Sequence, residues 1–300
     1  MNALGRYRLD QVLGSGSFAT VWRGYDPELD VVVAVKVLAD NWSLDADVRE
    51  RFLAEARLLR RISSDRVVRV HDVGVVEGRP YFVMDHVAGG SLADRVGTLA
   101  PAEAVRLTAE AAYAVQVVHD AGVVHRDVKP GNLLLDTAVD PPRVLLADLG
   151  SAKTLADASG YTVTTGTPAY MAPEQAGLAG GFDGRADVYA LAVVGHELLS
   201  GARPFTGEAG SDPTGPARRV VPAPVAAPRG LPAAVDTVLT RGLAPDPADR
   251  PADARQLADA LLAALVEPST PAPRSWPTGL VIAVAVVLVV VGAVVVTLLR

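Results

Sequence analysis

Residues 123–136 read VVHRDVKPGNLLLD, and five polar side chains stand there between two short apolar runs. The carboxylate of Asp127 can serve as a base toward a hydroxyl group, and Lys129 can neutralise charge that develops on a group in transfer. Asn132 supplies a neutral oxygen ligand for a hard cation such as Mg²⁺. His125, by contrast, has neighbours that favour packing and hydrogen bonding. The stretch therefore predicts a site of group transfer to a hydroxyl.

A second acidic residue, Asp148 in LLADLGSA, ends an apolar run just before a glycine. An isolated Asp-Leu-Gly carries little weight, but Asp148 and Asn132 at adjacent strand ends would form a two-ligand oxygen site. Such a site still needs ligands from a phosphate, which is how Mg²⁺ is usually held. We therefore expect a phosphate-bearing substrate.

Lys36 lies inside the apolar run VVVAVKVLA (31–39), which predicts a buried strand. A lysine in such a strand needs a partner or a ligand. The helix expected over residues 45–62 offers Glu55 on the same stripe as Phe52 and Leu59, facing inward. A Lys36–Glu55 pair is one interpretation, and an edge lysine with its amine in solvent is the other.

The stretch LGSGSFATVW (13–22) places Gly14 and Gly16 between strand-like flanks. Glycines permit close backbone approach to a ligand and leave amide N–H groups for phosphate oxygens. An ordinary hairpin turn is the alternative. No Gly-Lys-Ser/Thr follows, and the glycines lie within a hairpin, so neither a Walker A loop nor a dinucleotide fingerprint fits.

The secondary structure that positions these residues is predicted to change from strands to helices along the chain. Residues 7–38 alternate apolar and polar, which predicts a twisted antiparallel sheet. Two further strands, VVRVHDVGVV (67–76) and PYFVMDHV (80–87), are expected on either side of the turn EGR (77–79). Helices are expected over residues 101–121, 185–200, 232–243 and 252–265, and a loop over 206–231. The pattern predicts a small β-rich lobe followed by a larger helical lobe.

The C-terminal residues differ from the rest in composition. Residues 267–279, EPSTPAPRSWPTG, are typical of a semi-extended tether. Residues 280–299 carry Thr297 as the only polar side chain. A helix of that length spans about 30 Å, the thickness of the hydrocarbon core of a membrane. We expect a transmembrane helix, the alternative being a buried core helix or strand.

Composition excludes several classes of protein. The chain has 300 residues, a net charge of −6 and no cysteine, so disulfides and cysteine zinc sites are ruled out and nucleic acid is a disfavoured partner. The first residues, MNALGRYRLD, lack the apolar region of a signal peptide, and we therefore expect no export signal there.

The order of glycine loop, VAVK, inward glutamate, HRDVKPGN, DLG and GTPAYMAPE (166–174) resembles the protein-kinase signature set. More narrowly, the chain resembles the bacterial transmembrane eukaryotic-like (Hanks-type) serine/threonine kinases. This resemblance implies an α+β, bilobal protein-kinase fold over residues 7–265, with an N-lobe at about 7–87 and a C-lobe at about 88–265. A Pro-rich linker (266–279) and a single transmembrane helix (280–299) would follow.

The resemblance also implies roles for individual residues. Lys36, paired with Glu55, would contact the α- and β-phosphates of ATP, Asp127 would accept or orient the substrate hydroxyl, and Lys129 would stabilise charge. Asn132 and Asp148 would hold Mg²⁺, or Mn²⁺ in its place. The nucleotide would be bound by Leu13, Gly14, Ser15, Gly16, Ser17, Phe18, Ala19, Val21, Ala34, Lys36, Met84, Asp85, Val87 and Leu134.

Two structural pairs are implied in the same way: Asp187 would brace the catalytic loop from below, and Arg250 would pair with Glu174. The chain departs from the family pattern where Ala19 replaces the third glycine of the loop and DLG replaces DFG. Residues 206–219, where kinases carry a substrate-docking helix, have a composition poorly suited to a helix.

Arg126 precedes Asp127, and in kinases with that pair the arginine often meets a phosphate on the segment between DLG and APE. Autophosphorylation at Thr164, Thr165 or Thr162 is our hypothesis, and a polar loop that is never modified is the alternative.

The expected activity is phosphoryl transfer from ATP to Ser/Thr of proteins, and a homodimer for trans-autophosphorylation is compatible with it. We expect a single-pass protein of the cell membrane with its kinase domain in the cytoplasm, and no external sensor domain. The competing class is a membrane-tethered pseudokinase scaffold. A small-molecule phosphotransferase is disfavoured by GTPAYMAPE, which shapes a peptide-binding surface.

Overall fold

The computed structural model of the chain describes residues 3–149, 168–176, 183–205 and 222–266. The chain divides into two units, Met1–Glu267 and Pro268–Arg300, and all described residues belong to the first. The candidate phosphorylation sites Thr162, Thr164 and Thr165, the segment 206–219, and the expected linker and transmembrane helix therefore lie outside the described residues. None of the helices within the described ranges is long and apolar enough to span a bilayer.

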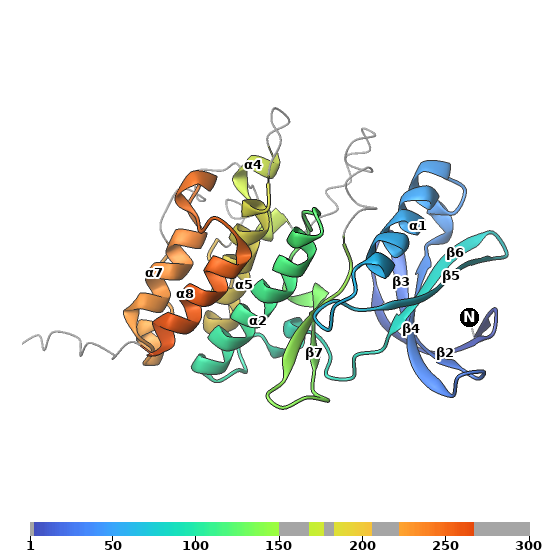
Figure 1. Ribbon diagram of the computed structural model, residues 1–300, viewed down its shortest axis with the longest axis horizontal. Helices are drawn as coiled ribbons and strands as arrows, with labels where there is room; N and C mark the ends of the chain where they lie inside the picture. The colour runs from blue at the N-terminus through green and yellow to red at the C-terminus, as the bar shows by residue number, and fades with distance from the viewer. Residues whose placement is uncertain (1–2, 150–167, 177–182, 206–221, 267–300) are drawn as a thin grey trace, which may run out of the picture. The chain divides into compact units, whose positions relative to one another are not determined.

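The N-terminal part of this unit is a six-stranded antiparallel sheet with the order β1-β2-β3-β4-β6-β5. Its strands are β1 (Ala3–Leu4), β2 (Tyr7–Ser15), β3 (Ala19–Asp26), β4 (Val31–Leu38), β5 (Val70–Val76) and β6 (Arg79–Asp85). The predicted antiparallel sheet is therefore confirmed. The helix α1 (Ala46–Arg61) follows β4 and lies beside β5 and β6 in Figure 1.

Alternation along the strands gives this sheet two different faces. Ala34 and Phe82 face the main core, where Phe82 packs on Phe52 of α1 with 5.0 Å between ring centroids. Val35 and Val83 face the other way, into a smaller cluster around Tyr7. A residue next to Lys36 on β4 thus lies on the opposite side of the sheet from the lysine.

The C-terminal part of the unit is helical, as predicted from periodicity. Its helices are α2 (Pro101–Asp120), α4 (Pro173–Ala176), α5 (Arg185–Ser200), α7 (Ala233–Gly242) and α8 (Ala254–Val266). Short 3₁₀ helices cover Asp40–Trp42, Leu92–Arg95, Pro130–Asn132, Pro168–Tyr170, Ala227–Arg229 and Pro247–Asp249. Most of α5 is buried, because α2, α7 and α8 pack around it. This buried helix also contacts the segment after α2, because Asp187 accepts the N–H groups of His125 and Arg126.

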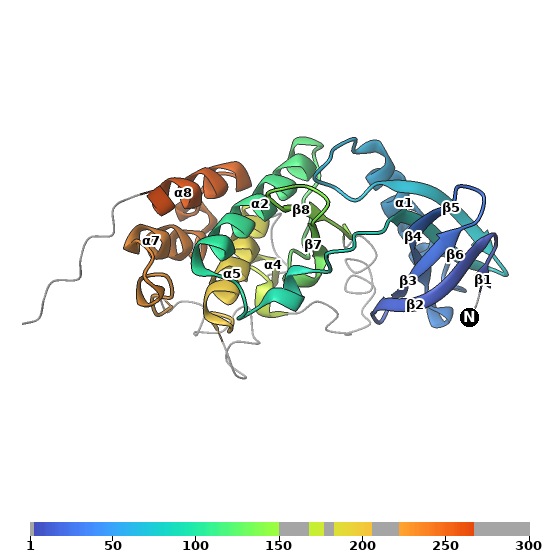
Figure 2. The same ribbon diagram turned by 90° about the horizontal axis from the view of Figure 1, so that it is seen from below.

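A two-stranded hairpin, β7 (Leu133–Asp136) and β8 (Arg143–Leu146), follows the 3₁₀ helix at Pro130–Asn132. Figures 1 and 2 both place this hairpin between the sheet and the helices. Val68 donates its N–H to the carbonyl of Leu146 at 3.0 Å, which ties the hairpin to the chain segment before β5. The hairpin is therefore the element that links the two lobes at the candidate site.

Three strand boundaries differ from the prediction, and one of them is the end of β6, which lies at Asp85 and not at Val87. The turn between β5 and β6 is not EGR, because Arg79 already pairs with Val76. Only Glu77 and Gly78 lie between the strands, with φ of 50° and 79°, and a two-residue loop with two positive φ values matches the twist of a hairpin. The strand also begins at Val70 and not at Val67, since Val67 bridges to Leu146 instead.

Candidate active site

Lys36 lies at the centre of a buried ion-pair cluster. Its Nζ atom is 2.9 Å from Glu55 Oε1 and 2.9 Å from Asp148 Oδ1. The strand β4 presents Lys36, the third turn of α1 presents Glu55, and Asp148 comes shortly after β8. The predicted Lys36–Glu55 pair is confirmed, and the alternative of an edge lysine in solvent is wrong. The contact with Asp148 was not predicted.

The charged groups of this cluster shift one another's pKa values. Burial alone would lower the pKa of Lys36, but the carboxylates of Asp148 and Glu55 outweigh it and raise that pKa above its usual value. Burial raises the pKa of Glu55 to about 7, Lys36 opposes this shift, and Asp148 reinforces it. One cation thus lies between two carboxylates, of which the more buried, Glu55, is only 1% exposed. The ammonium group is therefore held charged, whereas Glu55 titrates near neutral pH.

Asp127 is the centre of a second cluster, on the segment between α2 and β7. Its Oδ2 atom accepts hydrogen bonds from Lys129 Nζ at 2.8 Å and from Asn132 Nδ2 at 3.1 Å. Asn132 Nδ2 also donates to the carbonyl of Asp127 at 2.8 Å. The three polar residues singled out in the sequence are therefore in mutual contact. Because the amide nitrogen of Asn132 faces Asp127, its amide oxygen is the atom that a cation would contact.

The β7–β8 hairpin brings Asn132 toward Asp148. Leu133 pairs with Leu146, and the N–H of Ala147 donates to the carbonyl of Asn132 at 2.9 Å. Asn132 therefore lies beside the residue that precedes Asp148. Across the described ranges, no group of three or more His, Cys, Asp or Glu residues could hold a metal by itself. A metal at Asn132 and Asp148 would need oxygen ligands from a phosphate or water, the usual situation for Mg²⁺.

Two residues of the site have the left-handed backbone conformation that non-glycine residues rarely adopt: Arg126 with φ of 70° and Asp148 with φ of 61°. Asp187 of α5 supports the first of them. Its carboxylate accepts the N–H groups of His125 at 2.7 Å and Arg126 at 2.8 Å. The predicted bracing role of Asp187 is thus confirmed in its geometry.

His119, at the end of α2, completes this support. Its Nε2 atom is 2.8 Å from Asp187 Oδ2, and our reading of the sequence missed it. His125 is fully buried, and its Nδ1 atom accepts the N–H of Asp127 at 3.3 Å. This contact agrees with the hydrogen-bonding role expected for His125. Backbone and side-chain contacts therefore fix the catalytic segment from both sides of Asp127.

Arg250 and Glu174 form the expected pair. The two guanidinium nitrogens of Arg250 lie 2.6 and 2.8 Å from the two oxygens of Glu174. Arg250 is 2% exposed and also donates to the backbone carbonyls of Arg185, Ala244 and Pro245. A bidentate pair of this kind fixes both position and angle. It therefore ties α4 to the helical lobe at the segment MAPE.

The residues expected around an adenine converge on one side of the sheet. Ala34 pairs with Met84 across β4 and β6, and both belong to the main core, against which Val21 and Leu134 also pack. The N–H of Asp85 is donated to the carbonyl of Arg69 at 3.1 Å. The backbone N–H of Asp85, at the link between the lobes, is therefore already engaged within the protein.

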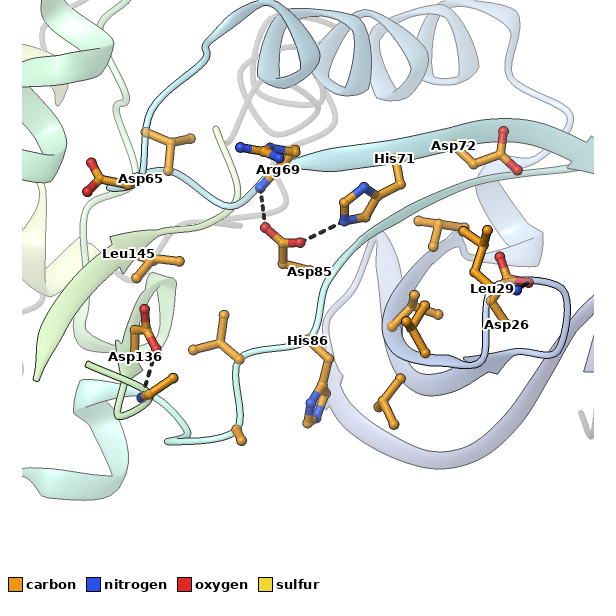
Figure 3. A pocket seen from close by; sticks show the side chains of 18 of the residues that line it. Asp26, Leu29, Asp65, Arg69, His71, Asp72, Asp85, His86, Asp136 and Leu145 are labelled. Atoms are coloured by element: carbon orange, nitrogen blue, oxygen red, sulfur yellow. Dashed lines mark hydrogen bonds and ion pairs between the residues drawn. The ribbon is translucent and has the colours of Figure 1, made fainter.

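A cavity of about 950 Å³ lies on the other side of this link (Figure 3). Asp26, Asp72, His71 and Asp85 contribute to its wall, and His71 Nε2 lies 2.6 Å from Asp85 Oδ1. Of the expected nucleotide residues, only Asp85 and Val87 line it. Its other lining residues include Val33 and Val83, which point away from the face that carries Lys36. The catalytic groups, and not this cavity, therefore define the candidate active site.

Comparisons with known proteins agree with this geometry. Residues 7–262 match the model of the protein kinase domain. The serine/threonine-protein kinase PknJ of Mycobacterium tuberculosis is 40% identical over 292 residues, which cover 92% of this chain and 49% of PknJ. The serine/threonine-protein kinase Pkn1 of Myxococcus xanthus is 37% identical over 88% of this chain and 39% of its own length. The chain thus spans half or less of the length of these two relatives.

Solved structures show the same architecture. The crystal structure of the Mycobacterium tuberculosis PknI kinase domain has a TM-score of 0.67 and 31% identity to this chain. The match covers 87% of this chain and 97% of that one.

Proposed function

The chain belongs to the protein kinase family, and we propose that it is a serine/threonine protein kinase. It would transfer the γ-phosphoryl group of ATP to Ser and Thr hydroxyls of proteins. The names of its relatives PknJ and Pkn1 support the choice of Ser/Thr. The proposal applies to the described unit, because the relatives are longer than this chain.

The observation that carries the proposal is the position of Lys36 between Glu55 and Asp148, at 2.9 Å from each. A buried cation is costly unless it is paired, and here the pair joins α1 of the N-lobe to the end of the hairpin in the C-lobe. The arrangement places an ammonium group beside Asp148, the proposed metal ligand, where the N-lobe meets the hairpin. Such a group suits the phosphates of a nucleotide.

The donor set fits a hard divalent cation, since Asn132 offers an amide oxygen and Asp148 a carboxylate. Asn132 and Asp148 would hold Mg²⁺, or Mn²⁺, which when bound neutralises negative charge on the phosphate oxygens. Asp127 would orient the substrate hydroxyl and accept its proton. Lys129, in contact with the same carboxylate, would offset the charge that develops on the transferred group.

The competing scaffold interpretation has less support. Pseudokinases typically lose the lysine, the catalytic aspartate or the metal ligands. Lys36, Asp127, Asn132 and Asp148 are all present here and are held by specific contacts. A protein substrate is favoured over a small molecule because the segment that contains Glu174 is fixed by Arg250. In a kinase this segment shapes the peptide-binding surface.

Regulation and location are further parts of the proposal. Phosphorylation at Thr162, Thr164 or Thr165 would provide a partner for Arg126, in trans between two copies of the chain if it forms a homodimer. The length and apolar character of residues 280–299 support a single membrane span. The need for ATP favours a cytoplasmic kinase domain at the cell membrane. Nucleic acid is not expected as a partner.

The test is incubation of the full chain with labelled ATP and Mg²⁺, with Asp127→Asn as the matched control. Label should enter the chain itself or a generic basic protein, and the variant should incorporate none above background. Mass spectrometry should then locate phosphate at Thr162, Thr164 or Thr165. No incorporation by the wild-type chain would favour the scaffold. Membrane association is tested separately, by flotation of the chain with lipid vesicles beside a chain that ends at residue 267.

A further inference from the structure

Trp42 lies in the short 3₁₀ helix Asp40–Trp42 that joins β4 to α1, and it contacts the tip of the glycine loop in two ways. Its ring stacks on that of Phe18, with 4.9 Å between centroids and 25° between planes. Its Nε1–H donates to the carbonyl of Ser17 at 3.0 Å. One side chain thus holds both a ring and a backbone group of the loop.

The rest of the loop tip is open. Leu13 to Ser17 are exposed, and no atom lies within 4 Å of a Cβ built on Gly14. Phe18 is nevertheless only 6% exposed, because the indole of Trp42 covers it. The carbonyl of Phe18 also accepts the N–H of Ala39 at 2.8 Å. The loop is therefore fixed on the Trp42 side and accessible on the other.

The hydrogen bond to Ser17 also orients the next peptide group. In a trans peptide the C=O of Ser17 and the N–H of Phe18 point in opposite directions. Because the carbonyl is directed at Trp42, the N–H of Phe18 is directed to the opposite side of the loop. An N–H group directed to the open side can donate to an anionic oxygen, whereas the N–H of Gly16 is already bonded to the carbonyl of Ala19 at 2.9 Å.

Trp42 is itself held in place. Asp40 forms an ion pair with Arg79 of β6 at 2.8 Å. The N–H of Asp45 donates to the carbonyl of Trp42 at 3.1 Å, and the Asp45 side chain caps α1 through the N–H groups of Asp47 and Val48. The loop tip is thus connected through Trp42 to the start of the helix that carries Glu55.

We infer that Trp42 is a positioning residue for nucleotide phosphates: it holds the tip of the glycine loop so that the N–H of Phe18 is directed away from Trp42, to the open side of the loop, before ATP arrives. This inference rests on the proposed function. A loop that is ordered in advance loses less conformational entropy on binding, so the affinity for the bound group rises. Trp42 should therefore act on the phosphates of ATP and leave the adenine and ribose unaffected.

The test measures binding of Mg²⁺-ATP and of adenosine to the full chain by calorimetry, together with KM and kcat. Trp42→Ala removes the ring stack and the hydrogen bond, and Trp42→Phe keeps a ring but removes the hydrogen bond. We expect Trp42→Ala to raise the Kd and KM for ATP about fivefold, which corresponds to about 1 kcal/mol. Trp42→Phe should raise them about twofold, a smaller effect because a ring remains. In both variants the Kd for adenosine should stay within about twofold of wild type, because adenosine has no phosphates. The value of kcat should also stay within about twofold, because the lost binding energy is shared by the ground state and the transition state.

Leu44→Ala is the matched control, because Leu44 lies two residues away in the same connection and is 93% exposed. It should leave every constant unchanged. Phe18→Leu removes the stack from the other side, and combined with Trp42→Ala it should add little further loss of ATP affinity. If Trp42→Ala alone unfolds the chain, Phe18→Leu and Trp42→Phe as single variants keep the inference testable.

Unchanged ATP affinity in the Trp42 variants would overturn the inference, and so would an equal loss of affinity for adenosine and ATP, since the latter marks a purely structural role. If the wild-type chain bound neither Mg²⁺-ATP nor adenosine, the proposed function itself would fail, and the inference with it. The wild-type measurement therefore separates the two failures.

Discussion

Replacement of Asp187 by asparagine should damage both stability and activity. The Asp187 carboxylate is 1% exposed and receives three donors: the N–H groups of His125 and Arg126, and the ring of His119. Asparagine has nearly the same shape but only one acceptor oxygen. Its amide nitrogen would face an N–H donor and could not accept a hydrogen bond from it.

The magnitude follows from these contacts. A hydrogen bond to a charged group contributes about 1.5–3 kcal/mol, and an unsatisfied buried donor costs a similar amount. With at least one such bond lost, we expect Asp187→Asn to lower the free energy of unfolding by about 2–4 kcal/mol. Arg126, whose φ is 70°, would then relax toward an ordinary conformation and move the adjacent Asp127. A displacement of about 1 Å at a reacting group costs on the order of 100-fold in rate.

Stability would be measured by urea unfolding of the full chain, and kcat by single-turnover phosphoryl transfer to a protein substrate. Asp249→Asn is the matched control, because Asp249 is an exposed aspartate of the same lobe. Its effect should stay within about 0.5 kcal/mol. An Asp187→Asn chain with wild-type stability and rate would refute the reasoning that the catalytic segment depends on α5.

Three further outcomes are expected. Because the pKa of Glu55 is raised to about 7, its charge opposite Lys36 is lost as pH falls through 7. The value of kcat/KM should fall over the same pH range. A Glu55→Gln chain should have low activity, and its pH–rate profile should lack that titration. Arg250→Lys keeps the charge but not the bidentate geometry with Glu174, and urea unfolding should show a loss of about 2–4 kcal/mol; a smaller loss when Glu174→Gln is already present would confirm the coupling. Chelation of divalent cations with EDTA should abolish phosphoryl transfer and added Mg²⁺ should restore it, whereas Asn132→Ala should raise the Mg²⁺ concentration needed for half-maximal rate; activity in EDTA would contradict the proposed metal site.

The sequence was informative where a regular period fixes the direction of a side chain. Glu55 shares a helical stripe with Phe52 and Leu59, and all three are buried in the structure. That phase predicted an inward-facing Glu55 and made its contact with Lys36, 19 residues away, one of two interpretations. Helices were also predicted over the ranges of α2, α5, α7 and α8, several of them from Pro or Asp start signals.

The sequence was less informative where the backbone leaves regular structure. The Lys36–Asp148 contact depends on the φ of 61° at Asp148, which no residue pattern specifies for an aspartate. The His119–Asp187 pair joins residues 68 positions apart. Neither the residues around His119 nor those around Asp187 indicate this contact. Trp42 was not singled out from the sequence, and its partners Ser17 and Phe18 lie between β2 and β3. These contacts are set by tertiary packing, which determines loop conformation only after the regular elements have met.

The two strained residues of the site are supported by different lobes. A left-handed conformation costs a non-glycine residue on the order of 1–3 kcal/mol and persists only where surrounding contacts over-determine it. The N–H of Arg126 is held by Asp187 in the core of the helical lobe, whereas the carboxylate of Asp148 is held by Lys36 of the sheet. Because Lys36 is also paired with Glu55, Glu55 of α1 and Asp148 share one ammonium group, whereas the support of Arg126 comes from α5. The expected metal ligand Asp148 is therefore linked through Lys36 to α1 of the N-lobe, and the segment of the expected base Asp127 is linked through Asp187 to α5 of the helical lobe.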